Sequence, residues 1–179
     1  MEKNLTHIAL FAALIAVLGL VPKIDIGAVP ITAQSMGIML CGTVLGARRG
    51  ALAVLLFLAL VAIGLPLLSG GRGGLGVFAG PSVGYLIGFP IAAFVAGLIV
   101  ERWRTSVGIA AFAGAVIGGV AVLYAFGIPG MALVLRKPLP EAAAMAMAFL
   151  PGDLIKAALA ALITQGIARM RPEALLSRA

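Results

Sequence analysis

Charged side chains are scarce in this sequence: they make up 11% of its 179 residues, whereas hydrophobic residues make up 63%. A soluble domain carries roughly a quarter charged residues, so this composition excludes an ordinary soluble protein. The apolar runs are too long for barrel strands and show no period-two alternation, which excludes a β-barrel. Because one span needs about 20 apolar residues, the runs predict an all-α integral membrane protein, a bundle of about six transmembrane helices.

Cysteine and histidine each occur once, as Cys41 and His7. A single cysteine excludes an internal disulfide and a metal site built from several cysteines. The sequence has no nucleophile elbow and no paired carboxylates, so we expect no enzyme activity, no metal and no cofactor. It also has no P-loop motif, so active transport would need another subunit or an ion gradient.

The apolar runs predict one membrane domain, residues 1–179, with six spans. These spans cover residues 5–21, 31–47, 50–65, 84–100, 106–127 and 151–168. The fifth span is expected to end at a helix break formed by Ile128, Pro129 and Gly130. Residues 141–150 are expected to form a helix that is too short to cross the membrane. No cleavage pattern of a signal peptide follows the first run, so it is expected to remain as a helix.

Basic residues lie mainly at the ends of the spans. The positive-inside rule therefore explains the net charge of +7 better than nucleic acid binding does. With the amino terminus inside, eight basic residues fall on the cytoplasmic side and four on the outer side. We expect a multi-pass protein of the cytoplasmic membrane with both termini in the cytoplasm. Arg48 and Arg49 would mark one cytoplasmic turn, and Arg102 and Arg104 the next.

The stretch from Pro151 to Lys156 reads Pro-Gly-Asp-Leu-Ile-Lys and opens the last span. Ionisable groups at membrane depth are costly and usually face a cavity or the protein interior. Asp153 and Lys156 share one helix face and would form a polar floor for a bound solute. The same residues also suit a plain helix start, with Pro at the first position and Asp at the positive dipole end. These six residues alone favour neither interpretation.

A second stretch, from Pro66 to Ser82, is rich in glycine and carries apolar side chains that favour burial. We call it the Gly-rich loop and expect it to fold back against the bundle on the outer side. Glycine permits close backbone approach, and exposed backbone N–H groups in such a loop attract anions. Arg72 would bind a carboxylate or phosphate bidentately, or else be a solvated surface arginine.

The predicted topology places the Gly-rich loop and the start of the last span on the same side. Arg72, Tyr85 and the Asp153–Lys156 pair would then meet in an outward-facing ligand pocket. Gln34 and Ser35 would either point into this pocket or cap their helix. A matching ligand is mostly apolar, with an acid at one end and a compact polar group at the other.

The first span carries two overlapping pairs of small residues, Ala9 with Ala13 and Ala12 with Ala16. Small residues at this spacing let another helix approach closely in lipid. From spacing alone, packing inside the bundle is favoured over a partner surface.

Several motifs resemble the BioY family, the biotin-binding S-components of energy-coupling factor (ECF) transporters. They are Gly64-Leu65-Pro66, Gly70-Gly71-Arg72-Gly73-Gly74, the run from Gly80 to Pro90, and the run from Pro151 to Lys156. The length and the expected number of spans also fit, so the resemblance covers essentially the whole chain. The Gly-rich motif and the Pro-Gly-Asp-x-x-Lys motif are specific in combination.

The resemblance implies biotin uptake. Asp153 would accept from a ring N–H of the ureido group, and Lys156 would donate to its carbonyl oxygen. Arg72, or the backbone of Gly73 and Gly74, would take the valerate carboxylate. One alanine pair would pack on the transmembrane coupling subunit, and two ATPase subunits would drive a toppling of the bundle. An autonomous proton-coupled or oligomeric solute carrier, a non-transporting assembly protein and a homo-oligomer are the alternatives left open.

Overall fold

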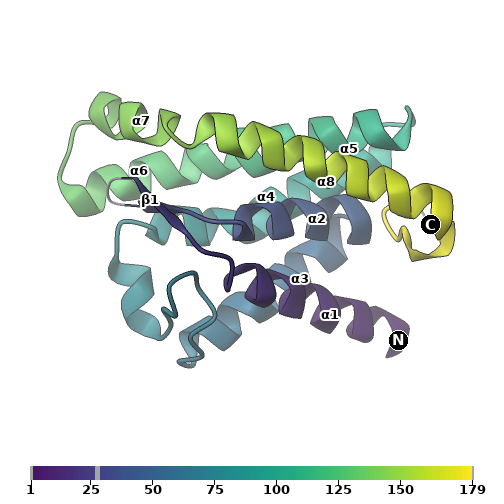
Figure 1. Cartoon of the computed structure of the whole chain (residues 1–179), viewed down its shortest axis with the longest axis horizontal. Coiled ribbons are helices and arrows are strands. Elements are labelled where there is room, and N and C mark those ends of the chain that lie inside the picture. Colours follow the sequence, from purple (N-terminus) through teal and green to yellow (C-terminus); the bar gives the residue numbers. More distant parts are fainter. Residues whose placement is uncertain (1, 27–28, 179) are drawn as a thin grey trace.

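The computed structural model describes residues 2–26 and 29–178, and helices account for most of them (Figure 1). The elements in chain order are α1 (Glu2–Leu18), β1 (Ile24–Ile26), β2 (Val29–Ile31), α2 (Gln34–Leu45), α3 (Ala47–Ala62), the 3₁₀ turn η1 (Leu75–Ala79), α4 (Val83–Arg102), α5 (Val107–Val116), the π-helical segment η2 (Ile117–Val122), α6 (Leu123–Leu135), α7 (Leu139–Met147), α8 (Leu150–Met170) and η3 (Pro172–Ala174). Since α5, η2 and α6 form one unbroken helix, the described residues contain seven helices apart from the two 3₁₀ turns.

Three of these helices are long and apolar enough to cross a membrane: α4, the continuous helix from Val107 to Leu135, and α8. Helices α1 and α2 are apolar but shorter. Large apolar side chains remain exposed on the outside of the bundle, for example Leu10 on α1 and Leu162 on α8. A lipid environment accounts for such faces, because exposed apolar surface of this extent is unfavourable in water. The prediction of a helical membrane fold is confirmed.

The expected break at Ile128, Pro129 and Gly130 is wrong, because the helix continues to Leu135. A helix in lipid tolerates proline when neighbouring helices support the freed backbone groups. Gly130 serves close packing: a Cβ there would lie 2.5 Å from the Cα of Gly84 on α4. Only at Arg136, in the left-handed conformation with φ 53°, does the helix end.

The predicted boundary between the second and third spans, 31–47 and 50–65, also needs correction. Helix α2 ends at Leu45, and Gly46, with φ 87°, makes the turn into α3. Arg48 and Arg49 therefore lie in the first turn of α3, where we had expected them to end the second span. A turn of one residue is short enough to escape hydropathy, because the apolar pattern runs on across it.

The expectation of an all-α chain is also incomplete, since β1 and β2 form a short antiparallel pair. Ile24 pairs with Ile31, and Ile26 with Val29. The predicted spans 5–21 and 31–47 leave this segment between them, and we had expected it to be a loop. The β-branched residues on both sides favour extended backbone and explain the pairing.

Small residues hold the helices at close range around α4. A Cβ on Gly42 of α2 would collide with the backbone of Ala93, and one on Gly118 with the backbone of Ala92. Small interface residues drive such packing in membranes, where lipid removes the hydrophobic force between helices. Helices α2 and α8 are further joined by a buried hydrogen bond of 2.8 Å between the hydroxyl groups of Thr43 and Thr164.

The amino ends of α2, α4 and α8 converge at the end of the bundle that lies opposite the two chain termini (Figure 1).

Candidate functional site

The Asp153–Lys156 pair lies at the start of α8 and faces the bundle. Pro151 occupies one of the first helical positions, and Asp153 lies in the first turn, as expected for a helix start. Asp153 is buried, with 6% of its surface exposed, and its Oδ1 lies 2.9 Å from Nζ of Lys156. The same turn therefore begins the helix and presents a buried ion pair, so the two interpretations of this stretch are compatible.

Two further hydroxyl groups complete this polar cluster. Ser35, at the start of α2, donates to Asp153 Oδ1 at 3.3 Å and accepts from Lys156 Nζ at 3.0 Å. Tyr124, on α6, donates to Asp153 Oδ2 at 2.8 Å. Both carboxylate oxygens are therefore hydrogen-bonded, which a buried charge requires. The sequence had left Ser35 as a helix cap or a cavity residue and had not singled out Tyr124, whose rarity as one of two tyrosines was the only signal.

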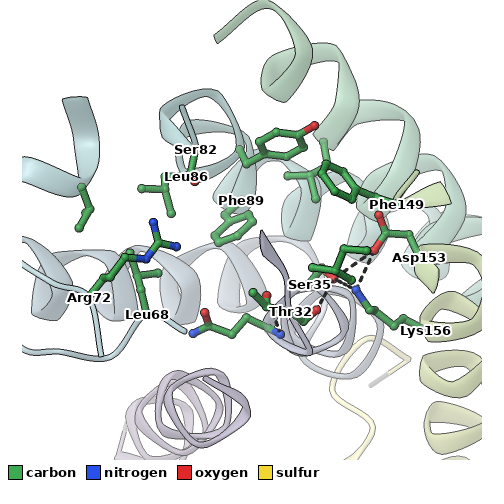
Figure 2. Close-up of a pocket in the computed structure, with 15 residues that line it drawn as sticks. Thr32, Ser35, Leu68, Arg72, Ser82, Leu86, Phe89, Phe149, Asp153 and Lys156 are labelled. Atoms are coloured by element: carbon green, nitrogen blue, oxygen red, sulfur yellow. Dashed lines mark hydrogen bonds and ion pairs between the residues drawn. The ribbon is translucent and has the colours of Figure 1, made fainter. Parts of the chain in front are cut away.

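A cavity of about 80 Å³ lies at this end of the bundle and is lined by Ser35, Asp153 and Lys156 of this cluster (Figure 2). Its wall is built from β2, α2, the Gly-rich loop, α4, α6 and α8, and includes the apolar side chains Leu68, Val77, Leu86, Phe89, Leu123 and Phe149. Polar groups converge on it from opposite sides. The ion pair and Ser35 lie on one side, and the Arg72 guanidinium points in from the other, with Phe89 between them (Figure 2).

Arg72 is fixed by the Gly-rich loop itself. Its backbone exchanges two hydrogen bonds with Leu68, and its Nε donates to the Ser69 carbonyl at 3.2 Å. The terminal nitrogens have no hydrogen-bond partner among the described residues and face the cavity (Figure 2). Gly73 and Gly74 do not line the cavity: Gly74 donates its N–H to the Val61 carbonyl at 2.8 Å. Of these three residues of the Gly-rich loop, the structure therefore places only Arg72 in the cavity wall.

Gln34 lines the cavity, but its side-chain amide is occupied by the backbone. Its Nε2 donates to the carbonyls of Ile15 at 3.2 Å and Leu67 at 3.0 Å, and its Oε1 accepts from the Ser69 N–H at 3.0 Å. We call this set of bonds the Gln34 brace. It joins α1 to the Gly-rich loop, so Gln34 shapes the cavity by positioning the loop.

Tyr85 lies in the cavity wall beside Tyr124. The two rings meet edge to face, with centroids 6.3 Å apart and planes at 84°. The ring of Tyr85 also packs against Gly127, where a Cβ would collide with it. Its buried hydroxyl group has no hydrogen-bond partner among the described residues. An unsatisfied buried hydroxyl in a cavity wall is a donor and acceptor available to a ligand.

The two alanine pairs of α1 point in different directions. Ala12 is buried and Ala16 half-buried, and both pack against the core of the bundle. Ala9 and Ala13 are exposed. Only the pair Ala9 and Ala13 is therefore on a surface that another chain could reach.

Helices that cross a membrane and a mostly apolar cavity with a few convergent polar groups define a membrane protein with a small-solute site. No group of three or more metal-ligating side chains occurs in the described part of the chain. Residues 2–173 match the sequence model of the BioY family, and the chain belongs to this family.

Individual relatives agree with this assignment. The chain is 56% identical to the biotin transporter BioY of Rhodobacter capsulatus over 189 residues, covering 99% of this chain and 100% of that one. It is 51% identical to the biotin transporter BioY of Rhizobium etli, covering 92% of each. A solved S-component for biotin from an ECF-type ABC transporter superposes with a TM-score of 0.89 at 35% identity, covering 94% of this chain and 92% of that one. These relatives are transporters, in agreement with the expectation that the chain is not an enzyme.

Proposed function

We propose that this protein binds biotin and mediates its uptake across the cytoplasmic membrane as the substrate-binding subunit of an ECF-type transporter. The observation that carries the proposal is the buried Asp153–Lys156 pair facing Arg72 across an apolar cavity (Figure 2). The names of the relatives and the solved S-component support biotin as the solute. Biotin has a compact polar ring system at one end and a carboxylate at the other, and this site offers a matching group at each end.

The ureido ring would bind at the ion pair. Its N–H groups are donors that suit the Asp153 carboxylate, and its carbonyl oxygen is an acceptor that suits the Lys156 ammonium. Ser35 and Tyr124 already hold the carboxylate in place, so little reorganisation is needed on binding. The hydroxyl group of Tyr85, which has no hydrogen-bond partner among the described residues, would gain one. At the far end, the planar guanidinium of Arg72 would bind the valerate carboxylate.

The cavity of about 80 Å³ must enlarge to accept such a solute, because ligand pockets typically measure about 300–1,000 Å³. The Gly-rich loop is the element that can move. Gly70, Gly71 and Gly74 adopt positive φ angles of 81°, 71° and 81°, and Gly71 and Gly74 have open space around them. The loop is attached to the bundle by few hydrogen bonds, chiefly the Gln34 brace and the bond from Gly74 to Val61. Outward movement of the loop would carry Arg72 with it and open the site.

In this proposal α1, α2, α3, α4, the Val107–Leu135 helix and α8 are the six spans, in a single domain with both termini in the cytoplasm. The site then opens to the outer face. The exposed pair Ala9 and Ala13 would contact the transmembrane coupling subunit, and two ATPase subunits would supply the energy. A second copy of this chain is the other occupant that the same small-residue surface would accept.

The deciding experiment is a titration of the purified protein with labelled biotin in detergent. We expect Asp153→Asn and Lys156→Ala each to weaken binding at least tenfold, because each removes a charge-assisted hydrogen bond worth about 1.5–3 kcal/mol. Lys137→Ala with Glu141→Gln is the matched control, since it removes an exposed ion pair outside the cavity. Unchanged affinity in both site variants would refute the site. Biotin uptake by liposomes containing this chain alone would refute the need for a motor.

A further inference from the structure

A second cavity lies at the opposite end of the bundle, where both termini are found (Figure 1). Its volume is about 580 Å³, within the usual range for ligand sites. It forms where the α2–α3 turn, the end of α4 and the carboxyl-terminal segment meet. Ser177 ties that segment in place, donating its N–H to the Val44 carbonyl at 2.9 Å and its hydroxyl to the Thr43 carbonyl.

Positive charge is concentrated around this cavity. Five arginines and a single carboxylate, that of Glu101, line it. The arginines are Arg48, Arg49, Arg102, Arg104 and Arg178. Glu101 does not pair with any of them in the described chain; its Oε1 instead accepts from the Ala47 N–H at 2.8 Å and caps α3. The cavity therefore keeps a large excess of positive charge.

The arginines are available to an anion. Arg49 and Arg178 each donate to backbone carbonyls, which leaves donors on both side chains unused. Arg178 Nε is buried with no acceptor among the described residues. The side chains of Arg48, Arg102 and Arg104 are exposed and make no hydrogen bond or ion pair within residues 2–26 and 29–178. Unsatisfied guanidinium donors in a recess are suited to phosphate, which they bind through a planar fork.

The positions of Arg48 and Arg49 strengthen this conclusion. Both lie in the first turn of α3, at the positive end of the helix dipole, where basic residues are locally unfavourable. The positive-inside rule explains why basic residues occur at this end of the bundle. It does not explain why five of them, from three separate segments, surround one cavity. A bound anion would stabilise both the arginines and the helix terminus.

The cavity also has an apolar side that runs along the bundle. Phe94 and Leu98, one turn apart on α4, line it together with Leu45 and Leu176. Phe94 is 39% exposed and faces the surroundings of the bundle. Trp103, half-exposed, follows at the end of α4, a position typical of the membrane interface. A free phosphate would need only the arginines, whereas a phosphate with an attached acyl chain would use both parts of the cavity.

We infer that this cavity binds the headgroup of an anionic phospholipid. The phosphate contacts the arginines, and an acyl chain lies along Phe94 and Leu98. Basic recesses between membrane helices bind anionic headgroups in this way. The site is separate from the biotin site, and the inference does not depend on which solute the protein carries.

Trp103 offers a direct test, because it is the only tryptophan in the chain and lies between two of the arginines. The full-length protein is titrated with brominated phosphatidylglycerol or brominated phosphatidylcholine in detergent micelles, and quenching of Trp103 is measured. We expect phosphatidylglycerol to quench at concentrations at least fivefold lower. Equal quenching by the two lipids would overturn the inference. Loss of phosphatidylglycerol quenching on addition of millimolar inorganic phosphate, without any lipid preference, would mean that the site takes free phosphate.

The test variant is Arg48→Gln with Arg104→Gln, which removes two arginines whose side chains make no hydrogen bond or ion pair with the described residues. Its matched control is Arg169→Gln with Arg171→Gln, two exposed arginines at the same end that do not line the cavity. We expect the test variant to lose most of the at least fivefold preference for phosphatidylglycerol, because each basic residue near the membrane surface adds to the attraction for anionic lipid. The ratio of quenching by the two lipids cancels any change in the exposure of Trp103. An equal effect of both variants would contradict a defined site.

Discussion

The ion pair at the start of α8 predicts a separation between stability and binding. Replacing Asp153 by Asn leaves the Lys156 ammonium, whose side chain is 15% exposed, without its counter-charge 2.9 Å away. Leaving one member of a buried pair alone costs about 3–5 kcal/mol. Because Lys156 keeps some access to water, we take the lower end, about 3 kcal/mol. In a chain of this length, that corresponds to a fall in Tm of roughly 6–12 °C.

Removing both charges should behave differently. In Asp153→Asn with Lys156→Met, no charge remains uncompensated, and such replacements of buried pairs are often neutral. We therefore expect the double variant to recover most of the lost stability. Biotin binding should not recover, since both the acceptor and the donor for the ureido group are gone. The double variant should bind at least a hundredfold more weakly than the unaltered protein, from two charge-assisted hydrogen bonds of about 1.5–3 kcal/mol each.

Thermal unfolding followed by circular dichroism, and calorimetric titration with biotin, measure the two quantities on the same samples. The reasoning fails if Asp153→Asn unfolds at the same temperature as the unaltered protein, or if the double variant regains affinity along with stability. Recovery of both would mean that the pair only begins the helix.

Three further predictions follow from individual contacts. Tyr124→Phe removes a hydrogen bond to a charged carboxylate and should lower the free energy of unfolding by about 1.5–3 kcal/mol. Tyr85→Phe removes a hydroxyl with no partner among the described residues and should not lower it, and chemical denaturation of both variants checks this. Gln34→Leu breaks two backbone contacts to the Gly-rich loop and one to α1, and should increase amide exchange in the loop and speed biotin release, measured by hydrogen exchange and by stopped flow. Gly130→Val forces a side chain into Gly84 and should destabilise the fold by several kcal/mol, seen as a lower Tm, and an unchanged Tm would contradict the close packing of α4 and α6.

Hydropathy alone predicts the helical membrane fold, because the cost of exposing backbone to lipid leaves few other solutions. It cannot place the helix ends as reliably. The turn at Gly46 involves one residue, and its positive φ has no counterpart in the apolar pattern. The proline at 129 gives the opposite error: it is typical of a helix break, yet close packing of α6 against α4 through Gly130 keeps the helix continuous.

The residues of the site likewise divide into those that the sequence indicates and those that it does not. Asp153 and Lys156 could be found from the sequence, because charges in an apolar run are rare and their spacing places them on one face. Arg72 and Tyr85 could be placed with them once the topology put their segments on one side. The role of Tyr124 could not, because its partner lies 29 residues away on another helix. Nor could the role of Gln34, since its three contacts are to backbone atoms, which leave no pattern in the sequence.

The Gln34 brace has a mechanical consequence. One amide holds both the Ile15 carbonyl near the end of α1 and the Gly-rich loop, and Gly19 leaves just enough room for it, with no Cβ to collide. While these bonds last, the loop and the end of α1 cannot be displaced independently. Opening of the loop must therefore either strain α1, the helix that carries Ala9 and Ala13, or break the bonds of the Gln34 brace. In the proposed function, movement of the Gly-rich loop and movement of α1 would therefore be coupled through one uncharged side chain, that of Gln34.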